Sequence, residues 1–235
     1  FNRSYLTSNF GKASKKAVIY TAITGNYDSL RDPVFVSDQF DYVCFTDNPD
    51  IRSNVWKMVA IEDHLLDNTR KARRIKLLPH LYLPDYEYSI WVDGNIMIIG
   101  DLIELMDRYL KYQPIAFFRH SEGRNCIYDE AEACIRLKKD DYDTIINQMD
   151  KYRALGYPEA NGLVSTGVII RRHQDEKVIK TMDDWWNELE MHSKRDQLSF
   201  NFVAWKNQLY YATINDYIRD NRYFLWRPHV STTKH

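Results

Sequence analysis

The chain contains several short apolar runs, each followed by small polar and acidic residues. Runs of this kind predict buried strands at residues 17–23, at 42–45 and near 55–61. Turn-forming residues end the first two runs, at 24–28 and 46–49. Simple turns are the commoner explanation of polar strand ends. Two such loops on adjacent strands would also lie side by side, where they can hold a nucleoside.

The most informative run spans residues 88–99 and is interrupted by Asp93, Gly94 and Asn95. The apolar residues before Asp93 predict a central strand that is covered on both faces. Ligands of open α/β sheets bind beyond the carboxyl ends of strands, and a glycine there lets a ligand approach the backbone. Asp93 is therefore a candidate for chemistry. A turn that leads into a hairpin arm at residues 96–99 explains the same pattern equally well.

A helical pattern with one basic face precedes this run, at residues 68–80. Asn68 or Thr69 is the expected N-cap, and apolar side chains recur on a second face of the helix. The basic face consists of Arg70, Arg73 and Lys76. A solvated charged face is the usual explanation of such a run. No acidic residue lies at positions 68–84, however, and arginine and lysine at this density suit a ligand that carries phosphate.

Further helices are predicted at residues 101–110, 125–137, 141–155, 178–191 and 193–205, and further strands at 114–118 and 168–170. Ser193 is the expected N-cap of the last helix, with Asp196 and Gln197 in its first turn. Trp185 and Trp186 are adjacent on one helix. One of them is therefore a candidate to leave the core and stack on a ring, although core packing is the default for tryptophan.

Two groups of polar residues beside these elements are candidate ligand contacts. His120 and Arg124 precede the helix at 125–137, whose N-terminus favours anions. A lone histidine in such a place is more often a capping or packing residue than a catalyst. Small polar residues at 165–167 precede a buried strand, and the glycine among them either allows a bulge or contacts a ligand.

Composition narrows the classes of protein. The chain has 235 residues, 44% of them apolar, which is enough for one large domain or two small ones. With 32 basic and 33 acidic residues it is not a general nucleic-acid binder, and no apolar run has the length of a transmembrane segment. Residues 1–16 are expected to be a flexible lead-in to a domain at 17–235. The chain begins with Phe1, so we treat it as a possible excised piece.

The three cysteines are an odd number without the spacing of a zinc site. Cys126 and Cys134 fall on one predicted helix, about 12 Å apart at the rise of an α-helix, which is beyond the reach of a disulfide. Buried free thiols are therefore expected. The odd count also argues against a fold that disulfides hold together.

The order of these segments resembles the TOD1/MUCI70 glycosyltransferase-like family. The resemblance is carried by residues 20–28, 44–47, 70–80, 91–95, 120–130, 165–171 and 195–199. It covers nearly the whole chain after Lys16. It implies a GT-A-like fold, in which a single Rossmann-like α/β domain has a mostly parallel, mixed central sheet flanked by helices.

The resemblance also implies a nucleotide-sugar donor and a divalent cation, Mn²⁺ or Mg²⁺. The family's Asp-x-Asp motif falls on Asp93, Gly94 and Asn95, and a late histidine corresponds to His229, so the implied metal ligands are Asp93, Asn95 and His229. Asn95 is a neutral and weaker ligand than a carboxylate. The pair Asp196 and Gln197 resembles an Asp-Gln pair that begins a helix beside the sugar site in related transferases.

The remaining site residues follow from these roles. The donor-binding residues are expected to be Thr21, Ile23, Tyr27, Asp47, Arg70, Arg73, Lys76, Asp93 and Gly94. The residues expected to face the sugar and acceptor are His120, Arg124, Ser165, Thr166, Gly167, Trp185 and Gln197. Asp196 is the candidate catalytic base if the transfer inverts the anomeric centre. If the transfer retains it, Asp196 instead orients the donor hydroxyls.

The expected function is transfer of a sugar from a nucleotide-sugar donor to a glycan or other hydroxyl acceptor. The main alternative is a metal-dependent hydrolase acting on a phosphate or amide bond, because some members of the resembled family are linked to lipid turnover. A non-catalytic domain that binds nucleotide sugars is a third reading. The expected setting is a bacterial polysaccharide or surface-glycan pathway, in the cytoplasm or peripheral to the membrane, with no nucleic-acid partner.

Overall fold

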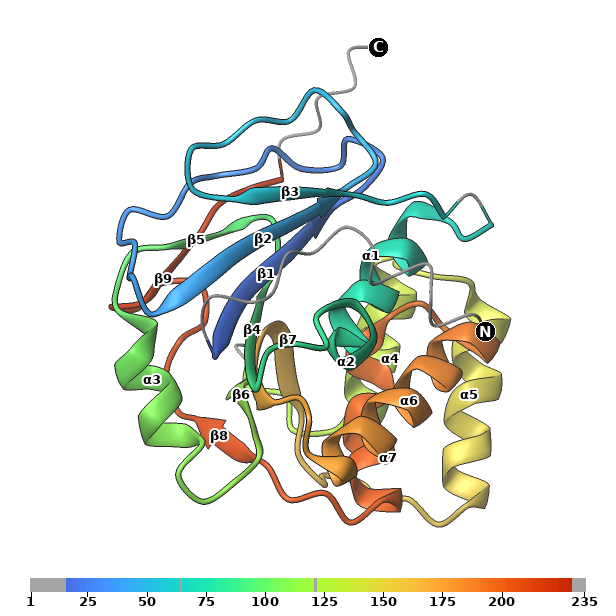
Figure 1. Cartoon of the computed structure of the whole chain (residues 1–235). Helices are drawn as coiled ribbons and strands as arrows, with labels where there is room; N and C mark the ends of the chain where they lie inside the picture. Colours follow the sequence, from blue (N-terminus) through green and yellow to red (C-terminus); the bar gives the residue numbers. More distant parts are fainter. Residues whose placement is uncertain (1–15, 64, 121, 230–235) are drawn as a thin grey trace.

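The computed structural model describes residues 16–63, 65–120 and 122–229 of the chain shown in Figure 1. All of the predicted lead-in except Lys16 lies outside these residues. The centre of the fold is a seven-stranded sheet in the order β3-β2-β1-β4-β7-β6-β8. Its strands are β1 Ala17–Ile23, β2 Phe40–Thr46, β3 Lys57–Ala60, β4 Tyr88–Val92, β6 Ile115–Arg119, β7 Val164–Arg172 and β8 Ala212–Ile214.

The sheet is mixed and mostly parallel. Strand β1 pairs in parallel with β2 and β4, β2 with β3, and β6 with β8, whereas β7 is antiparallel to both β4 and β6. This arrangement confirms the predicted α/β fold class. The chain order reverses at β1, which lies between β2 and β4, and such reversal points are where open α/β sheets bind ligands.

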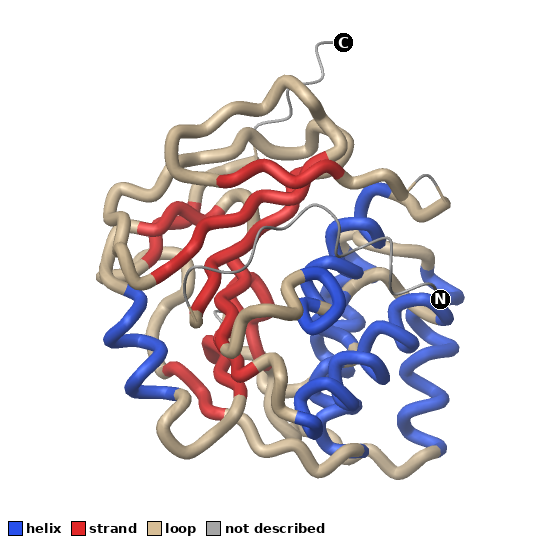
Figure 2. Tube along the Cα trace, viewed as in Figure 1, coloured by secondary structure: helices blue, strands red, loops and turns tan. Residues whose placement is uncertain are grey.

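Helices cover both faces of the sheet, with most of them on one side (Figures 1 and 2). Helix α3, Leu102–Tyr109, packs on one face and contributes to the apolar layer there. The second apolar layer lies under the other helices. These are α1 Asn68–Leu77, α2 Pro79–Tyr82, α4 Ile127–Arg136, α5 Tyr142–Ala154, α6 Glu176–Met191 and α7 Phe200–Lys206.

Strand β1 shows why these sequences form a central sheet. All seven of its side chains are buried, because alternate residues of a strand point to opposite faces and both faces are covered. Val18 and Tyr20 belong to the layer under the larger group of helices. Ile19 and Ile23 belong to the layer on the α3 side. The position of the polar residues that follow Ile23 is thereby fixed.

Two predicted helix starts are wrong. The carboxylate of Asp67, and not Asn68 or Thr69, caps α1, because Asp67 Oδ1 accepts a hydrogen bond from the N–H of Arg70 at 3.0 Å. Ser193 does not start a helix, because its hydroxyl donates to a carboxylate on another segment, at Asp140, at 2.7 Å. A short 3₁₀ turn, η1 Asp196–Leu198, follows instead and precedes α7.

The hairpin considered for residues 96–99 is absent. The N–H of Ile96 donates to the carbonyl of Asp93 at 2.9 Å, so the tight turn exists. It leads the chain away from β4, however, into β5 Ile96–Ile98. Strand β5 pairs antiparallel with β9, Phe224–Trp226, in a separate two-stranded sheet. The tip after β4 is therefore both a turn and a meeting point with the carboxyl-terminal part of the chain.

The sequence expectations on cysteines are confirmed, since Cys44, Cys126 and Cys134 are buried free thiols. In the part of the chain that the structure describes, no helix has both the length and the apolar character needed to cross a membrane. Trp185 and Trp186 are both buried, so the prediction that one of them leaves the core is wrong. Helix α6 packs against other helices as well as the sheet, which gives both indole rings apolar partners.

Candidate functional site

Two adjoining hollows lie at the carboxyl ends of β1 and β4, where the chain order of the sheet reverses. The smaller, of about 170 Å³, lies between the loop after β1, the start of α1 and the residues after β4. The larger, of about 430 Å³, extends from there toward α4, β7 and η1. Both are lined by Tyr27, Arg73, Asp93, Asn95 and His229, so together they form one cleft.

The loop after β1 forms one wall of the smaller hollow. Gly25 has a φ of 59° and Asn26 a φ of 55°, in the left-handed region that favours these two residue types. The N–H of Gly25 donates to Asp47 Oδ1 at 2.9 Å. The hydroxyl of Thr24 donates to the carbonyl of Asn68 at 2.8 Å. A Cβ at position 25 would lie 1.9 Å from Asn68 Nδ2, so the loop and α1 pack without room for a side chain.

Asp93 lies at the tip of β4, where two glycines allow the backbone to approach closely. Its N–H donates to the carbonyl of Gly167 in β7 at 2.8 Å. A Cβ on Gly167 would lie 3.4 Å from Asp93 Oδ2, and a Cβ on Gly94 would lie 2.5 Å from a methyl group of Ile23. Trp91 Nε1 donates to Asp93 Oδ1 at 2.7 Å. The orientation of this carboxylate is therefore fixed by its own strand.

The sequence left open whether Gly167 allows a bulge or contacts a ligand. The pairing of β6 with β7 bears on both. The register shifts between Phe117, which pairs with Ile169, and Phe118, which pairs with Ser165. The residues of β7 that this shift skips include Gly167, so the ladder between β6 and β7 is irregular at this glycine. Gly167 also lines the larger hollow. The irregular pairing and the place in the lining of the cleft thus occur at the same residue.

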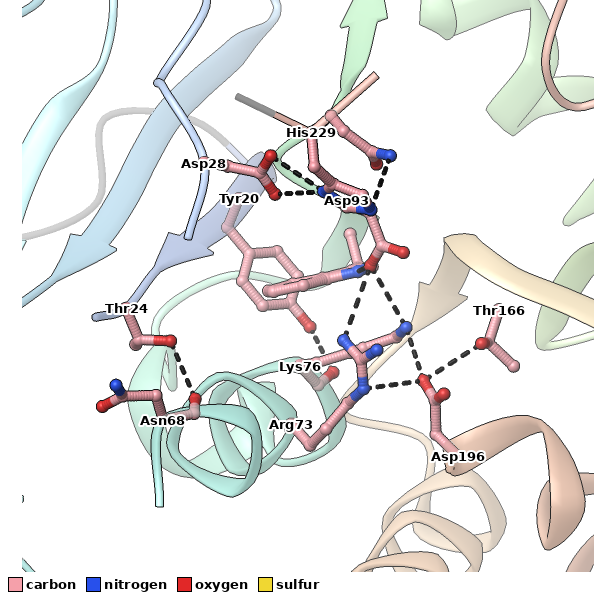
Figure 3. Close-up of polar contacts among 12 residues, drawn as sticks. Tyr20, Thr24, Asp28, Asn68, Arg73, Lys76, Asp93, Thr166, Asp196 and His229 are labelled. Atoms are coloured by element: carbon pink, nitrogen blue, oxygen red, sulfur yellow. Dashed lines mark hydrogen bonds and ion pairs between the residues drawn. The ribbon is translucent and has the colours of Figure 1, made fainter. Parts of the chain in front are cut away.

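Two carboxylates and two cations form a network beneath the cleft (Figure 3). Lys76 Nζ lies 2.6 Å from Asp196 Oδ2 and 3.3 Å from Asp93 Oδ1. The guanidinium of Arg73 lies 3.2 Å from Asp196 Oδ2 and 3.8 Å from Asp93 Oδ1. The hydroxyl of Thr166 donates to Asp196 Oδ2 at 3.0 Å. The two cations of α1 thereby join the tip of β4 to the start of η1.

Burial and charge act in opposite directions on this network. Burial alone would raise the pKa of Asp196, but the positive charges of Arg73 and Lys76 outweigh it and hold that pKa well below its usual range. Burial likewise opposes the charge on Arg73, whereas Asp196 and Asp93 raise its pKa. Asp196 is therefore an ionised carboxylate that accepts from Thr166 and is paired with two cations, which makes it a poor proton acceptor.

His229 comes from the carboxyl-terminal part of the chain and closes the other side of the cleft. Its Nδ1 lies 2.9 Å from Oδ1 and 3.0 Å from Oδ2 of Asp28, and its ring packs against Tyr27 with centroids 4.7 Å apart. Its Nε2 lies 3.2 Å from Asn95 Nδ2. Because a carboxylate only accepts, the hydrogen of a neutral His229 belongs on Nδ1, which leaves Nε2 as an acceptor facing Asn95.

A second group of charged side chains lines the far wall of the larger hollow. Arg124 donates from Nε to Glu130 Oε2 and from Nη2 to Glu122 Oε2, both at 2.7 Å. His120 Nε2 lies 3.5 Å from Glu130 Oε2. Burial lowers the pKa of His120, and the attraction of Glu130 only partly opposes this effect. His120 therefore stays neutral at pH 7.

Most of the residues singled out from the sequence meet in this cleft. The predicted residues that line the smaller hollow are Ile23, Tyr27, Arg73, Asp93, Gly94, Asn95 and His229. Those that line the larger hollow include His120, Arg124, Ser165, Thr166, Gly167, Asp196 and Gln197. Lys76 has no exposed surface and reaches the cleft only through its two carboxylate partners.

Trp185 and Thr21 are sealed inside the fold. The ring of Trp185 is fully buried and packs on Phe200, with centroids 4.8 Å apart, so no face is free to stack on a sugar. Its Nε1 donates to the carbonyl of Asp196 at 3.1 Å, so Trp185 supports η1 from behind. Thr21 is buried within β1, which excludes direct contact with a donor.

Arg70 and Asp47 support neighbouring segments and do not line the cleft. Arg70 donates to the carbonyls of Leu189 at 3.0 Å and His192 at 2.9 Å, so it satisfies the carboxyl-terminal end of α6. Arg70 lines neither hollow, so the cleft gives no support to its predicted role in binding the donor. Asp47 acts on the smaller hollow through the N–H of Gly25.

Several residues that line the cleft were not predicted from the sequence. The most important is Asp28, whose partner His229 lies 201 residues away. The small polar residues after β1 were a signal for a site, but spacing alone did not separate Asp28 from an ordinary turn residue. Glu122 and Glu130 were likewise passed over, because their role depends on their contact with Arg124.

The predicted metal ligands are too few to hold a cation by themselves. Among the described residues no three His, Cys, Asp or Glu side chains come close enough to hold a metal ion together. Asp93 Oδ2 has no hydrogen bond from these residues, whereas Oδ1 is bound by Trp91 and Lys76. Mg²⁺ is commonly held by one or two carboxylates together with substrate phosphates. Asp93, Asn95 and His229 do not form a complete cage, so a cation there would need further oxygen ligands from a substrate.

The fold and the cleft together define an α/β domain with an open cleft at the reversal point of a mostly parallel sheet. A family comparison gives the class a name. The model of the TOD1/MUCI70 glycosyltransferase-like domain matches residues 46–221, and the chain belongs to this family. The match includes α1, the tip of β4, β7 and η1, and it ends before His229.

Two curated relatives come from Arabidopsis thaliana. The protein named probable hexosyltransferase MUCI70 is 30% identical over an alignment of 160 positions, which covers 63% of this chain and 27% of that protein. The protein named alkaline ceramidase TOD1 is 28% identical over an alignment of 241 positions, which covers 86% of this chain and 52% of that protein. The chain thus spans about half the length of one relative and about a quarter of the other.

Solved glycosyltransferase structures show a more distant likeness. The glycosyltransferase GlyE of Streptococcus pneumoniae TIGR4 is 12% identical, with a TM-score of 0.44 over 86% of this chain and 45% of that one. The bifunctional glycosyltransferase WbbM is 11% identical, with a TM-score of 0.47 over 88% of this chain and 39% of that one.

Proposed function

We propose that this domain transfers a sugar from a nucleotide-sugar donor to a hydroxyl group of a glycan or similar acceptor. The observation that carries the proposal is the single cleft in which Arg73 and Asp93 line both hollows. Transfer needs a place for the nucleotide, a place for the sugar and acceptor, and a charged group where the two meet. The family membership and the relative named probable hexosyltransferase support the same conclusion.

The smaller hollow is assigned to the nucleoside. It is bounded by the backbone of Gly25, the ring of Tyr27 and the start of α1. Tyr27 is 61% exposed, so its ring is available for contact with a base. The larger hollow is assigned to the sugar and acceptor, because its lining is mostly polar and charged.

The leaving group of the reaction is a nucleoside diphosphate, whose negative charge grows as the bond to the sugar breaks. Arg73 is the cation of α1 that lines both hollows, and its place at their junction suits that diphosphate. Asp93, Asn95 and His229 would hold a divalent cation beside it. When bound, such a cation polarises the phosphate oxygens as a Lewis acid.

Asp196 is assigned a positioning role. It binds Lys76 and Arg73 and accepts from Thr166, so it sets where the positive charge of α1 lies. This role differs from both that the sequence left open, catalytic base and orientation of the donor hydroxyls. It argues against the base, since a carboxylate paired with two cations is a weak base. Proton removal from the acceptor is therefore not assigned to Asp196.

Hydrolysis of an amide is the second candidate, because TOD1 is named an alkaline ceramidase and matches 86% of this chain. A hydrolytic metal site usually has three protein ligands and an open position for water. The three candidates here are one carboxylate, one amide and one imidazole, and a substrate diphosphate would supply what they lack. The cleft therefore favours transfer over hydrolysis.

Binding of the donor is the first test. We would measure the melting temperature of the domain with a panel of nucleotides and nucleotide sugars, with and without Mn²⁺. A ligand at 100 times its dissociation constant stabilises a fold by about 2.7 kcal/mol, which raises the melting temperature by a few degrees. We expect one nucleotide class to do so for the wild type and for Asp107→Ala, an exposed acid on α3, but not for Asp93→Ala.

Product analysis then separates transfer from hydrolysis. We would incubate the stabilising nucleotide sugar with and without hydroxyl acceptors and follow the products by mass spectrometry. The proposal predicts a nucleoside diphosphate and a glycosylated acceptor. Absence of any nucleotide effect, or release of a fatty acid from ceramide by the purified domain, would refute it.

A further inference from the structure

A third hollow, of about 390 Å³, lies at the carboxyl end of β6 and the start of β7. Arg124 lines this third hollow and the larger hollow of the cleft alike. Neighbouring residues of β7 divide between them, since Val164 lines the third hollow and Ser165 the larger one. The hollow therefore adjoins the part of the cleft assigned to sugar and acceptor, on the side away from the nucleoside.

The charged groups around the third hollow are not balanced. Its lining residues include Arg119 and Arg124 but no aspartate or glutamate. Arg124 is neutralised by Glu122 and Glu130, which lie on its other side. Arg119 is exposed, and among the described residues its guanidinium has no ion pair or hydrogen bond. This cation is therefore available to an oxygen atom of a ligand.

A tyrosine hydroxyl in the wall of the third hollow can also donate a hydrogen bond, as Arg119 can. Tyr211 Oη accepts from Asn201 Nδ2 at 2.8 Å, and in the described part of the chain no acceptor takes its hydrogen. Asn201 is itself fixed, because its Oδ1 accepts from the N–H of Val164 at 3.3 Å. Tyr211 thus presents a donor from a position that the backbone of β7 holds in place.

The backbone keeps this donor uncovered. Gly162 has a φ of 87°, which side chains rarely adopt. A Cβ at position 162 would lie 3.4 Å from the hydroxyl oxygen of Tyr211. The first carbon of a side chain there would already be in contact with that hydroxyl. A glycine in the left-handed conformation therefore leaves the hydroxyl accessible.

We propose that the third hollow is an acceptor subsite, which binds the part of an oligosaccharide acceptor that lies beyond the reacting sugar. Arg119 and Tyr211 donate hydrogen bonds to its oxygen atoms, which belong to hydroxyl groups in a neutral glycan and to carboxylates in an acidic one. The assignment of this hollow to the acceptor rests on the proposed transferase function. Its binding of oligosaccharide can be measured without any turnover.

The test compares oligosaccharide ladders of increasing length. We would titrate the domain by calorimetry with maltose-type oligomers of glucose, which are neutral, and with alginate oligomers, which carry carboxylates. Variants are Arg119→Ala and Tyr211→Phe. The matched control is Arg108→Ala, an exposed arginine on α3, on the opposite face of the sheet.

Affinity for one of the ladders is expected to rise with length in the wild type and in Arg108→Ala. Arg119→Ala should lose about tenfold for the longest oligomers and little for the shortest, since a hydrogen bond to a charged group contributes about that much. Tyr211→Phe should show a smaller loss with the same dependence on length. A greater loss with alginate than with glucose oligomers would identify the oxygen as a carboxylate.

Three results would overturn the subsite. They are no binding of either ladder, equal losses in Arg108→Ala and Arg119→Ala, and losses that do not depend on length. The nucleotide panel reports on the proposed function separately, because it uses the smaller hollow. Nucleotide binding without oligosaccharide binding removes the subsite alone, whereas length-dependent oligosaccharide binding without nucleotide binding removes the transferase function and leaves a glycan-binding site.

Discussion

Lys76 and Asp196 form an ion pair with an N–O distance of 2.6 Å, and neither side chain has appreciable contact with solvent. Lys76 is in the last turn of α1 and Asp196 begins η1, so the pair joins segments 120 residues apart along the chain. Removing one member of a buried pair leaves a charge without compensation, which is costly. The pair thus couples the stability of the fold to the geometry of the cleft.

Replacement of Lys76 by methionine should lower the free energy of unfolding by about 3 kcal/mol, because Arg73 then remains, among the described residues, the one ion-pair partner of Asp196 and Asp93. Urea denaturation measures the change. Lys180→Met is the matched control, since Lys180 also lies 2.6 Å from a carboxylate, that of Asp184, but is 64% exposed. An exposed pair contributes about 0.5 kcal/mol. Equal losses in the two variants would contradict the assignment of Lys76.

The low pKa of Asp196 predicts a specific loss of stability in acid. An unfolded aspartate titrates near pH 3.9, and the folded carboxylate of Asp196 titrates lower still because of Arg73 and Lys76. Its contribution is therefore complete above pH 4 and is lost as pH falls toward the folded pKa. In Asp196→Asn the pH dependence below pH 4 should be shallower by up to about 1.4 kcal/mol per pH unit. Urea titrations from pH 5 to pH 2.5 measure the slopes, and parallel slopes in the two proteins would refute the assignment.

Local patterns were sufficient to predict most of the secondary structure. Strand β1 was predicted with its observed bounds, Ala17–Ile23, because seven consecutive β-forming residues end at a cluster of turn residues. Helix α5 was predicted to within one residue at each end, since Asp141 caps it and Gly156 follows it. Both signals lie within a few residues of the element that they define, which is why sequence alone contains them.

The contacts that charged residues make with other elements could not be predicted from the sequence. The lack of acids at positions 68–84 suggested unpaired cations, yet Arg73 and Lys76 are paired with Asp93 and Asp196. Spacing along the chain reports on neighbours within one element and is silent on contacts between elements. The pairing of His229 with Asp28 was missed for the same reason. The sequence therefore predicted which residues are functional candidates better than it predicted what each one contacts.

Gly25 should be more sensitive to substitution than another glycine with a similar backbone. Gly25 and Gly156 have φ values of 59° and 81°, so Gly→Ala strains both, at a cost of about 1 kcal/mol. Only at position 25 would the new methyl group collide with Asn68, at 1.9 Å, whereas at position 156 it meets no atom within 4 Å. Gly25→Ala should therefore also abolish the rise in melting temperature with nucleotide, while Gly156→Ala retains it. Retention of nucleotide binding in Gly25→Ala would show that the loop does not contact the nucleoside.

Dependence on a divalent cation tests the roles of Asp93, Asn95 and His229. If these residues hold a cation beside the diphosphate, EDTA should remove most of the donor turnover and Mn²⁺ should restore it. Asp28→Asn should raise the Mn²⁺ concentration needed for half-maximal rate by about 10-fold to 100-fold, since partners of ligating histidines typically contribute that much. The exposed acid variant Asp107→Ala should not change it. Undiminished turnover in EDTA would instead assign the neutralisation of the leaving diphosphate to Arg73, the cation that both hollows share, with Lys76 beneath it.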